Sequence, residues 1–397
     1  MKTAANQKER RGRKMIKKCL LGLMRLLPLQ KAIVLESHPD LSDNTYALYE
    51  ELLRRGCHKK YRIYWMKTFP GKPDWNLPEG VSYFENQPSG LRETLKRAYV
   101  LNTSRYIFDC NTFVKKRRKR QIRFHLGHGM PIKIDLEYSR RFGECDRYMV
   151  QSPFWYDIFE KMIRVPREVL CPLGYPRNDV LVKAKEIPAW EKQRSAYKKC
   201  IIWMPTYRQH RAHEEKSLKN SYPYGMPCVE NKDQLLHLEA QLADRQMLLL
   251  FRPHPVQDLS VLEKEELPHI IIADDKFLES LDCTLYELLA WTDALITDYS
   301  SVYFDYLLTG CPIALTIADR KEYFTHFTLA FDDYKEAVKG FYVEKFEQLS
   351  SFLQETADEI DSTREERMQA KEKYHTENAG NSAAAIVDLL EKEYHLQ

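Results

Sequence analysis

The stretch TDYSSVYFD, residues 297–305, follows the apolar run 294–296 and passes directly into an amphipathic segment. A buried strand that leads straight into a helix is the transition expected in an α/β unit. Two interpretations of the pair Ser300-Ser301 stay open on this stretch alone. Serine at a helix start caps orphan backbone N–H groups, whereas a helix N-terminus that carries two hydroxyls also suits a phosphate.

The same pattern extends outward from this stretch in both directions. Apolar runs that we predict to be strands lie at 200–204, 247–251, 269–273, 294–296 and 312–315, and earlier in the chain at 32–35, 62–65, 81–84, 106–108, 121–125 and 146–152. Strands that alternate with helices of about 10–15 residues indicate βαβ units and parallel sheets.

A polar, proline-bearing stretch at 184–198 divides these two series of strands. We therefore expect one α/β domain over 32–186, a second over 187–397 that ends in charged helices, and a cleft between them. A length of 397 residues agrees with two domains. Nine scattered cysteines without a CxxC pair argue against a disulfide framework or a zinc site.

The first 31 residues form a basic head. Residues 1–31 carry ten Lys or Arg and one acid, so the rest of the chain is acidic overall and a nucleic-acid partner is not expected. Segment 14–29 places apolar and basic residues on opposite faces of a helix, and it is too short to span a bilayer. We favour an amphipathic helix on an anionic membrane surface. A helix packed on the protein's own core and a signal peptide remain alternatives.

Unusual polar residues follow the predicted strands of the second domain at the point where each strand ends. The carboxyl ends of parallel strands meet at one edge of a sheet, where ligands bind. Forked arginine donors and a helix start suit a multiply charged anion, most simply a pyrophosphate. The residues that we expect to hold it are Arg208, Arg252, His254, Ser300 and Ser301.

Asp305 lies one helical turn after Ser301, where a carboxylate can accept hydrogen bonds from ribose hydroxyls. Pro205 and Thr206, at another strand end, are assigned to the same nucleotide site.

His128 belongs to the first domain and follows the predicted strand 121–125. The flanking Gly127 and Gly129 let the backbone approach a ligand closely, which favours a reactive role for the histidine over a structural one. Lys133 adds charge beside the same site. His125 could share a metal with His128, but no acid or cysteine completes a ligand set nearby, so we expect no metal.

Two further segments are candidates for the cleft. Arg177 is placed to reach it, and Asp179 either serves function there or, with Asn178, caps the helix that follows. Asp43 and Asn44 come after the first strand of the chain and are expected to face the acceptor.

Five ordered motifs carry a resemblance to a known family. They are HGMPIK (128–133), GYPRND (174–179), PTYR (205–208), RPHP (252–255) and TDYSSVYFD (297–305). Together they resemble the CDP-glycerol glycerophosphotransferase family, the teichoic-acid primases and polymerases of Gram-positive bacteria. The family pattern at the first motif is Trp-His-Gly-Thr-Pro, where this chain has Gly127 and Met130 in place of the tryptophan and the threonine.

The resemblance implies a GT-B fold, in which two Rossmann-like domains face a central cleft and the second binds most of the donor. It implies peripheral attachment to the cytoplasmic face of the membrane. It also implies transfer of glycerol phosphate or ribitol phosphate from a CDP-linked donor to an undecaprenyl-diphosphate-linked saccharide, with release of CMP. In this scheme His128 is the general base, and we expect neither a cofactor nor an obligatory metal.

Two other classes of function stay open. A GT-B glycosyltransferase that uses a nucleotide-sugar would share the fold and the phosphate site. A non-catalytic protein that binds a membrane surface would explain the basic head and the basic run 115–120, but not the polar residues at the strand ends. That run is either a solvated face or a contact for anionic lipid or acceptor phosphate.

Overall fold

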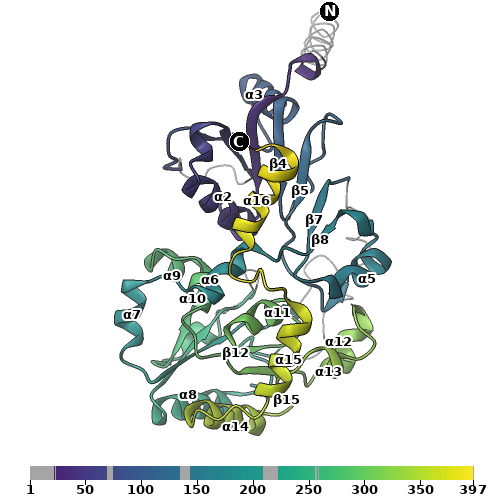
Figure 1. Cartoon of the computed structure of the whole chain (residues 1–397). Helices are drawn as coiled ribbons and strands as arrows, with labels where there is room; N and C mark the ends of the chain where they lie inside the picture. Colours follow the sequence, from purple (N-terminus) through teal and green to yellow (C-terminus); the bar gives the residue numbers. More distant parts are fainter. Residues whose placement is uncertain are drawn as a thin grey trace, which may run out of the picture.

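The protein consists of two α/β halves, each built around a parallel sheet (Figure 1). The structure is a computed structural model that describes residues 22, 24–68, 75–134, 144–208, 222–254, 257 and 259–396. The fold class predicted from the alternation of strands and helices is thus correct. The boundary expected at residue 186 falls between the last strand of the first sheet and the first strand of the second.

The first sheet has the strand order β3-β2-β1-β4-β5-β7-β8, and every neighbouring pair is parallel. Its strands are β1 (Gln30–Glu36), β2 (Arg62–Lys67), β3 (Val81–Glu85), β4 (Ser104–Asp109), β5 (Ile122–His125), β7 (Arg147–Met149) and β8 (Leu170–Cys171). The central strands are buried on both faces, which explains their continuous apolar sequences.

The second sheet repeats this winding in the order β11-β10-β9-β12-β13-β15. Its strands are β9 (Lys199–Trp203), β10 (Met247–Phe251), β11 (Ile270–Ile272), β12 (Ala294–Thr297), β13 (Ile313–Thr316) and β15 (Phe341–Val343). In both sheets the winding reverses beside the first strand, between β1 and β4 and between β9 and β12. Ligands of open α/β sheets bind at such switch points, outside the carboxyl ends of the strands.

Helices cover the faces of both sheets (Figure 1). In the first half the helices are α2 (Asp43–Arg54), α3 (Leu91–Thr103), α5 (Tyr156–Ile158) and α6 (Asp179–Val182). In the second half they are α7 (Pro188–Arg194), α8 (Lys232–Asp244), α9 (Asp275–Ser280), α10 (Leu285–Leu289), α11 (Val302–Tyr306), α12 (Arg320–His326), α13 (Tyr334–Ala337), α14 (Phe346–Ala357) and α15 (Arg364–Tyr374).

The last helix, α16 (Ser382–Tyr394), returns to the first half and packs against α2, although the sequence placed it with the second domain. The hydroxyl of Tyr106 donates to the carbonyl of Tyr394 at 2.8 Å. The carboxylate of Asp179 accepts hydrogen bonds from the first backbone N–H groups of α16, those of Ser382 and Ala383, at 2.8 and 2.9 Å. Asp179 therefore does cap a helix, but one that begins two hundred residues later rather than the helix that follows it.

Apolar packing joins the two halves. Trp155 of the first half is fully buried, and its ring contacts Phe304 edge-on at 4.8 Å between centroids, beside Tyr374. A short antiparallel pair also crosses the boundary, formed by β6 (Lys133–Ile134) and β14 (Thr328–Leu329).

A fully buried carboxylate, that of Asp305, completes the joint. Among the described residues, four side chains donate to it: Arg177 and Asn178 at 2.7 Å, Tyr286 at 2.6 Å, and Gln151. Three of the four come from the other half. The ribose contact predicted for Asp305 is therefore not retained, because both carboxylate oxygens are already engaged by the protein.

Most of the expected amphipathic segment 14–29 lies outside the described residues. Its described end contains a short 3₁₀ helix, η1 (Met24–Leu26), with Leu26 78% exposed. In the part of the chain that the structure describes, no helix has the length and apolar character needed to cross a membrane.

We predict that Asp305→Ala destabilises the protein by about 3–5 kcal/mol, because it leaves the buried Arg177 guanidinium without one of its two carboxylate partners. Denaturant unfolding followed by far-UV circular dichroism measures the loss. Asp275→Ala is the matched control: it removes the carboxylate partner of Arg252, but Asp275 is 71% exposed, so the change should stay below about 1 kcal/mol. Equal losses in the two variants would contradict the role of Asp305 in the joint.

Candidate active site

A cavity of about 460 Å³ lies between the two halves, a size that suits a small-molecule ligand. The first half lines it with the loop after β5, and the second half with residues that follow β9, β10 and β12. The polar residues on its wall are His128, Lys133, Thr206, His254, Ser300 and Ser301. The carboxyl edges of the two sheets thus face the same space.

The loop that carries His128 touches the serine pair of the other half. A Cβ atom on Gly129 would lie 2.4 Å from Ser301 Oγ, so no larger residue fits there without movement. Gly127 has φ +67°, and a Cβ there would lie 2.7 Å from the hydroxyl of Tyr175. The glycines on both sides of the histidine are therefore required by close approach.

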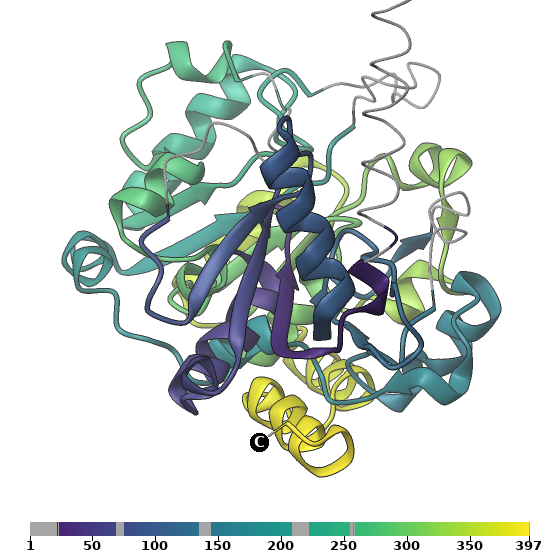
Figure 2. The ribbon, with the colours of Figure 1, turned by 90° about the horizontal axis from the view of Figure 1, so that it is seen from above.

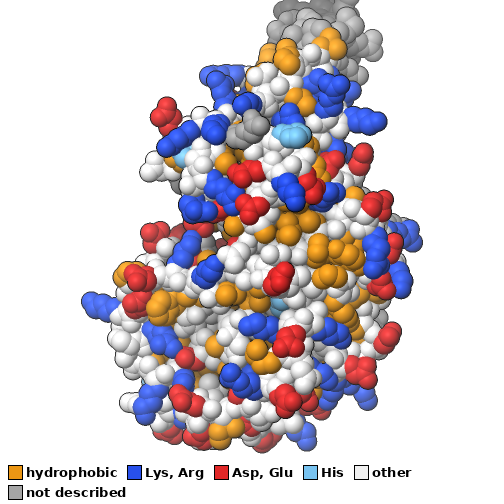
Figure 3. Space-filling model, viewed as in Figure 1, with side chains coloured by type: hydrophobic (Ala, Val, Ile, Leu, Met, Phe, Trp, Pro, Cys, Tyr) orange, Lys and Arg blue, Asp and Glu red, His pale blue; other side chains and the backbone are white. Residues whose placement is uncertain are grey.

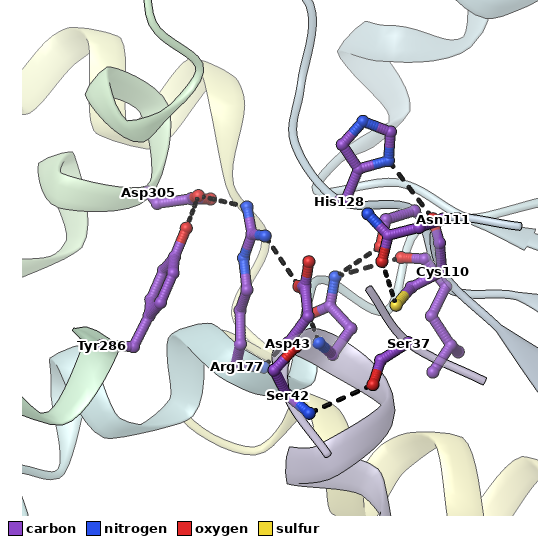
Figure 4. A network of polar contacts seen from close by, with 12 residues as sticks. Ser37, Ser42, Asp43, Cys110, Asn111, His128, Arg177, Tyr286 and Asp305 are labelled. Atoms are coloured by element: carbon purple, nitrogen blue, oxygen red, sulfur yellow. Dashed lines mark hydrogen bonds and ion pairs between the residues drawn. The ribbon is translucent and has the colours of Figure 1, made fainter. Parts of the chain in front are cut away.

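His128 is exposed at this cavity. Its Nδ1 lies 3.2 Å from the carbonyl oxygen of Cys110 (Figure 4). A carbonyl only accepts hydrogen bonds, so Nδ1 carries the proton and Nε2 is the basic nitrogen. Although one side of the ring faces the cavity, the surrounding protein desolvates the imidazole and lowers the pKa of His128 below its usual 6.5; the negative charge of Asp43 opposes this shift, and Arg177 adds to it. The imidazole is therefore neutral at pH 7 and able to accept a proton.

Asp43 and Arg177 link the surroundings of His128 to the joint between the halves. Figure 4 places the guanidinium of Arg177 between two carboxylates, donating to Asp43 at 2.7 Å and to Asp305 at 2.7 Å. It also lies 4.6 Å from the ring centre of Tyr286. Arg177 was expected to reach the cleft and Asp43 to face the acceptor, but both contribute to the joint, and neither is among the described residues that line the cavity.

Asn44, expected to face the acceptor, is instead buried and binds two backbone segments. Its amide donates to the carbonyl oxygen of Gly127 at 2.8 Å and accepts from the backbone N–H of Arg177 at 3.1 Å. Asn44 therefore holds the loop of His128 against the loop of Arg177.

The structure distinguishes the two interpretations of Ser300 and Ser301, helix capping and phosphate binding. Helix α11 begins at Val302, and within the described residues the side chain of Ser301 makes no capping hydrogen bond. Ser300 Oγ accepts only a long contact of 3.5 Å from the N–H of Val302. Both residues line the cavity, so capping does not account for the pair.

Lys133 is the cation on the first-half side of the cavity. Its ammonium group donates to the hydroxyl of Tyr323 and lies 5.0 and 4.9 Å from the ring centres of Tyr323 and Phe327. Burial lowers the pKa of Lys133 to about 8, partly offset by Asp298. The group therefore remains mostly charged at pH 7, although its charge is lost within the next two pH units.

The two arginines expected at the pyrophosphate site are engaged elsewhere. Arg208 is buried and donates at 2.6 Å to both Asp298 and Asp319. Arg252 donates to Asp275 at 2.6 Å and to the carbonyl oxygen of Ala273 at 2.8 Å. Neither arginine is among the described residues that line the cavity. The sequence predicts that five residues meet at one site. His254, Ser300 and Ser301 do line the same cavity, whereas the two arginines do not.

The remaining candidates of the second half lie close to Arg208. His254 is exposed at the cavity and stacks on Tyr207 at 5.1 Å between ring centres. The N–H of Thr206 donates to Asp298 at 3.0 Å, and the residue lines the cavity, whereas its neighbour Pro205 is not part of the described wall.

Sequence reasoning missed the acids that neutralise Arg208. Asp298 lies in the motif 297–305, directly after strand β12, and the sequence predicts it only to end that strand. Asp319 follows strand β13. The rule that polar residues directly after parallel strands lie at the ligand-binding edge of the sheet would have selected both acids. It would not have shown that they bind an arginine rather than a ligand.

His125 lies away from the cavity. Its Nδ1 is 2.6 Å from Asp109, and its ring stacks on Phe113. Among the described residues, no group of three His, Cys, Asp or Glu side chains is placed to hold a metal ion.

Comparison with known proteins gives one family and several relatives. The family model for CDP-Glycerol:Poly(glycerophosphate) glycerophosphotransferase matches residues 22–392. A teichoic acid ribitol-phosphate primase of Bacillus spizizenii is 26% identical over 327 residues, which cover 76% of this chain and 77% of the primase. A teichoic acid poly(glycerol phosphate) polymerase of Staphylococcus epidermidis is 27% identical over 354 residues, or 80% of this chain and 43% of the polymerase.

The fold is also similar to that of a solved structure, a single-residue variant of the wall teichoic acid polymerase TagF. The TM-score is 0.72 with 20% sequence identity, and the match covers 100% of this chain and 98% of that one.

We predict that the imidazole of His128 titrates below pH 6.5 and that Asp43→Asn lowers its pKa further, because the variant removes the negative charge that stabilises the imidazolium. Asparagine tolerates the left-handed backbone of residue 43, where φ is +62°. NMR titration of the histidine ring measures both values, with Asp275→Asn as a distant control. An unchanged or raised pKa in Asp43→Asn would contradict the electrostatic link.

Proposed function

From the premise that the chain belongs to the CDP-glycerol:poly(glycerophosphate) glycerophosphotransferase family, we propose that it transfers a polyol phosphate from a CDP-linked donor to a hydroxyl acceptor, with release of CMP. The polymer is a teichoic acid or a related cell-wall polymer, and the polyol is glycerol or ribitol, because the relatives include enzymes named for each. The observation that carries the proposal is the cavity in which His128 of one half faces Ser300 and Ser301 of the other.

In the proposed reaction, Nε2 of His128 takes the proton of the acceptor hydroxyl. The hydroxyl oxygen attacks the β-phosphorus of the CDP-polyol, the bond from that phosphorus to the bridging oxygen breaks, and CMP leaves with the bridging oxygen. Transfer of a phosphoryl group depends mainly on positioning and charge neutralisation. The neutral state and the fixed tautomer of His128 support its assignment as the base.

We assign pyrophosphate binding to residues of the second half that line the cavity and to the neighbouring Lys133 of the first half. Ser300, Ser301 and Thr206 supply hydroxyl donors, and Lys133 and His254 supply positive charge or N–H donors. Arg208 acts indirectly by holding the loop of Thr206 in place, through Asp298. Arg252 remains a candidate only if its exposed ion pair with Asp275 opens when the donor binds.

A lipid-linked acceptor, an undecaprenyl-diphosphate-linked saccharide, and peripheral attachment at the cytoplasmic face of the membrane complete the proposal. The support for attachment is the amphipathic pattern of segment 14–29 together with the exposed Leu26 at its described end.

The experiment that tests the function is CMP release from CDP-glycerol and from CDP-ribitol, each with a lipid-linked disaccharide acceptor and with EDTA present. Release that depends on the acceptor identifies the polyol, and its persistence in EDTA supports a reaction without an obligatory metal. A folded protein that releases nucleotide only from UDP- or GDP-sugars would instead identify a glycosyltransferase. A protein silent with every donor, yet bound to membranes, would favour the non-catalytic alternative.

We predict that His128→Ala lowers kcat about 10²–10⁴-fold and leaves the affinity for the CDP-polyol within a few-fold, because a general base acts on the acceptor rather than on the donor. CMP release and isothermal titration calorimetry with the donor separate the two effects. His237→Ala, an exposed histidine on α8, is the matched control and should retain full turnover. Near-normal turnover in His128→Ala would refute the assignment.

We predict that kcat/KM for the donor falls as the pH rises through about 8, because the ammonium group of Lys133 loses its proton there and with it the attraction for the pyrophosphate. Lys133→Met should lower kcat/KM at neutral pH and remove this alkaline limb. A limb that persists in Lys133→Met would assign it to another group. The pH dependence of kcat/KM for wild type and variant decides between these outcomes.

A further inference from the structure

A second cavity, of about 820 Å³, lies at the end of the first sheet opposite the active-site cavity. Lys31 lies at the start of β1, Arg62 begins β2, and Lys59 and Lys60 immediately precede β2. All four line this cavity, together with Tyr61 and His58. Because β1 and β2 are parallel, these residues share the amino edge of the sheet.

The cations of this cavity are paired differently from the arginines near the active site. Lys31, Lys59, Lys60 and Arg62 are exposed, and none of them has a carboxylate partner within 4 Å among the described residues. Glu79 is the one acid on the described wall. By contrast, Arg208 and Arg177 near the active site each have two carboxylates. Unpaired cations around a concave surface are suited to an anion with several oxygens, such as a phosphate.

The basic run 115–120 extends the same edge. It immediately precedes β5, which is parallel to β4, so it lies at the amino ends of the strands. Lys116 pairs with Asp146 at 2.8 Å, and Arg118 donates to the carbonyl oxygen of Leu27. The other four residues of the run are exposed and have no described carboxylate partner: Lys115, Arg117, Lys119 and Arg120.

Exposed apolar side chains lie beside these charges. Leu26 is 78% and Leu27 39% exposed, and the bond from Arg118 to Leu27 fixes this segment to the basic edge. Figure 2 looks down on this end of the molecule, where η1 lies next to α3. Figure 3 shows Lys and Arg side chains on both flanks of the upper end. Apolar side chains surrounded by cations are typical of a surface that docks on anionic lipid.

We propose that the amino edge of the first sheet is a docking face for an anionic phospholipid surface, and that the 820 Å³ cavity receives the phosphate of one headgroup. All residues named for this face belong to the part of the chain that the structure describes. The proposal adds to the proposed function by orienting the enzyme for a membrane-bound acceptor, but lipid binding is measured without donor or acceptor.

The orientation has a consequence for the acceptor. Strands of six or seven residues, such as β4 and β1, separate the docking face from the carboxyl edge by about 20 Å. His128 lies at that far edge. The reacting hydroxyl of a lipid-linked acceptor must therefore lie about 20 Å above the membrane surface, which selects acceptors with an extended saccharide.

The test compares the full-length protein with two triple variants in co-sedimentation with vesicles. Lys59→Gln, Lys60→Gln and Arg62→Gln together remove three charges of the cavity. The matched control, Lys192→Gln, Lys264→Gln and Lys276→Gln, removes three exposed charges of the second half. Vesicles contain either phosphatidylglycerol mixed with phosphatidylcholine or phosphatidylcholine alone. Each cation near such a surface contributes about fivefold to binding.

We expect the cavity variant to bind phosphatidylglycerol vesicles at least tenfold more weakly than wild type, the control to bind within twofold, and neither to bind phosphatidylcholine alone. Wild-type binding by the cavity variant, or an equal loss in the control, would overturn the proposal. Submillimolar binding of inorganic phosphate, abolished in the cavity variant while vesicle binding persists, would also overturn it by identifying a site for a soluble anion. CMP release with a soluble acceptor should stay unchanged in the cavity variant, which separates docking from transfer.

Discussion

The arrangement of the active site depends on the buried carboxylate of Asp305. A carboxylate without access to water is tolerated only when its oxygens are fully hydrogen-bonded, and three of the four described donors come from the other half of the chain. This requirement sets how the two sheets meet. It also fixes Arg177, which reaches on to Asp43 beside His128. Movement of one half relative to the other would therefore disturb the joint and the electrostatic surroundings of the histidine together.

The buried arginine of the second half and the groups that face the cavity differ in how their charge is balanced. The buried Arg208 is neutralised by two acids and shapes the loop after β9, as expected for a cation removed from water. The groups that face the cavity from the two halves are hydroxyls, two histidines and the ammonium group of Lys133. The cavity thus keeps donors available without a buried, unpaired guanidinium, and the pKa of about 8 at Lys133 reflects the cost of burying even one cation.

Parallel strands also separate two kinds of surface. The carboxyl edge of the first sheet carries His128 and meets the second half. The amino edge carries cations without a carboxylate partner among the described residues, together with the exposed Leu26 of η1 and Leu27 after it. Both edges exist because every strand of the sheet points the same way. One element of the fold therefore holds the site for transfer at a fixed distance from the face proposed to bind lipid.

The sequence by itself determined the parallel sheets, the positions of the main strands, and the placement of His128, His254, Ser300 and Ser301 at strand ends that face one cavity. These features follow from local periodicity, since apolar runs of strand length and the residues after them are adjacent in the chain. Only the tertiary structure decided which charged side chains bind partners within the protein and which face the cavity. Arg208 binds Asp298 and Asp319, Asp305 binds Arg177, and Asp179 caps α16, each across 90 to 204 positions of sequence. Burial makes such partners necessary, but local sequence does not reveal which distant residue provides them.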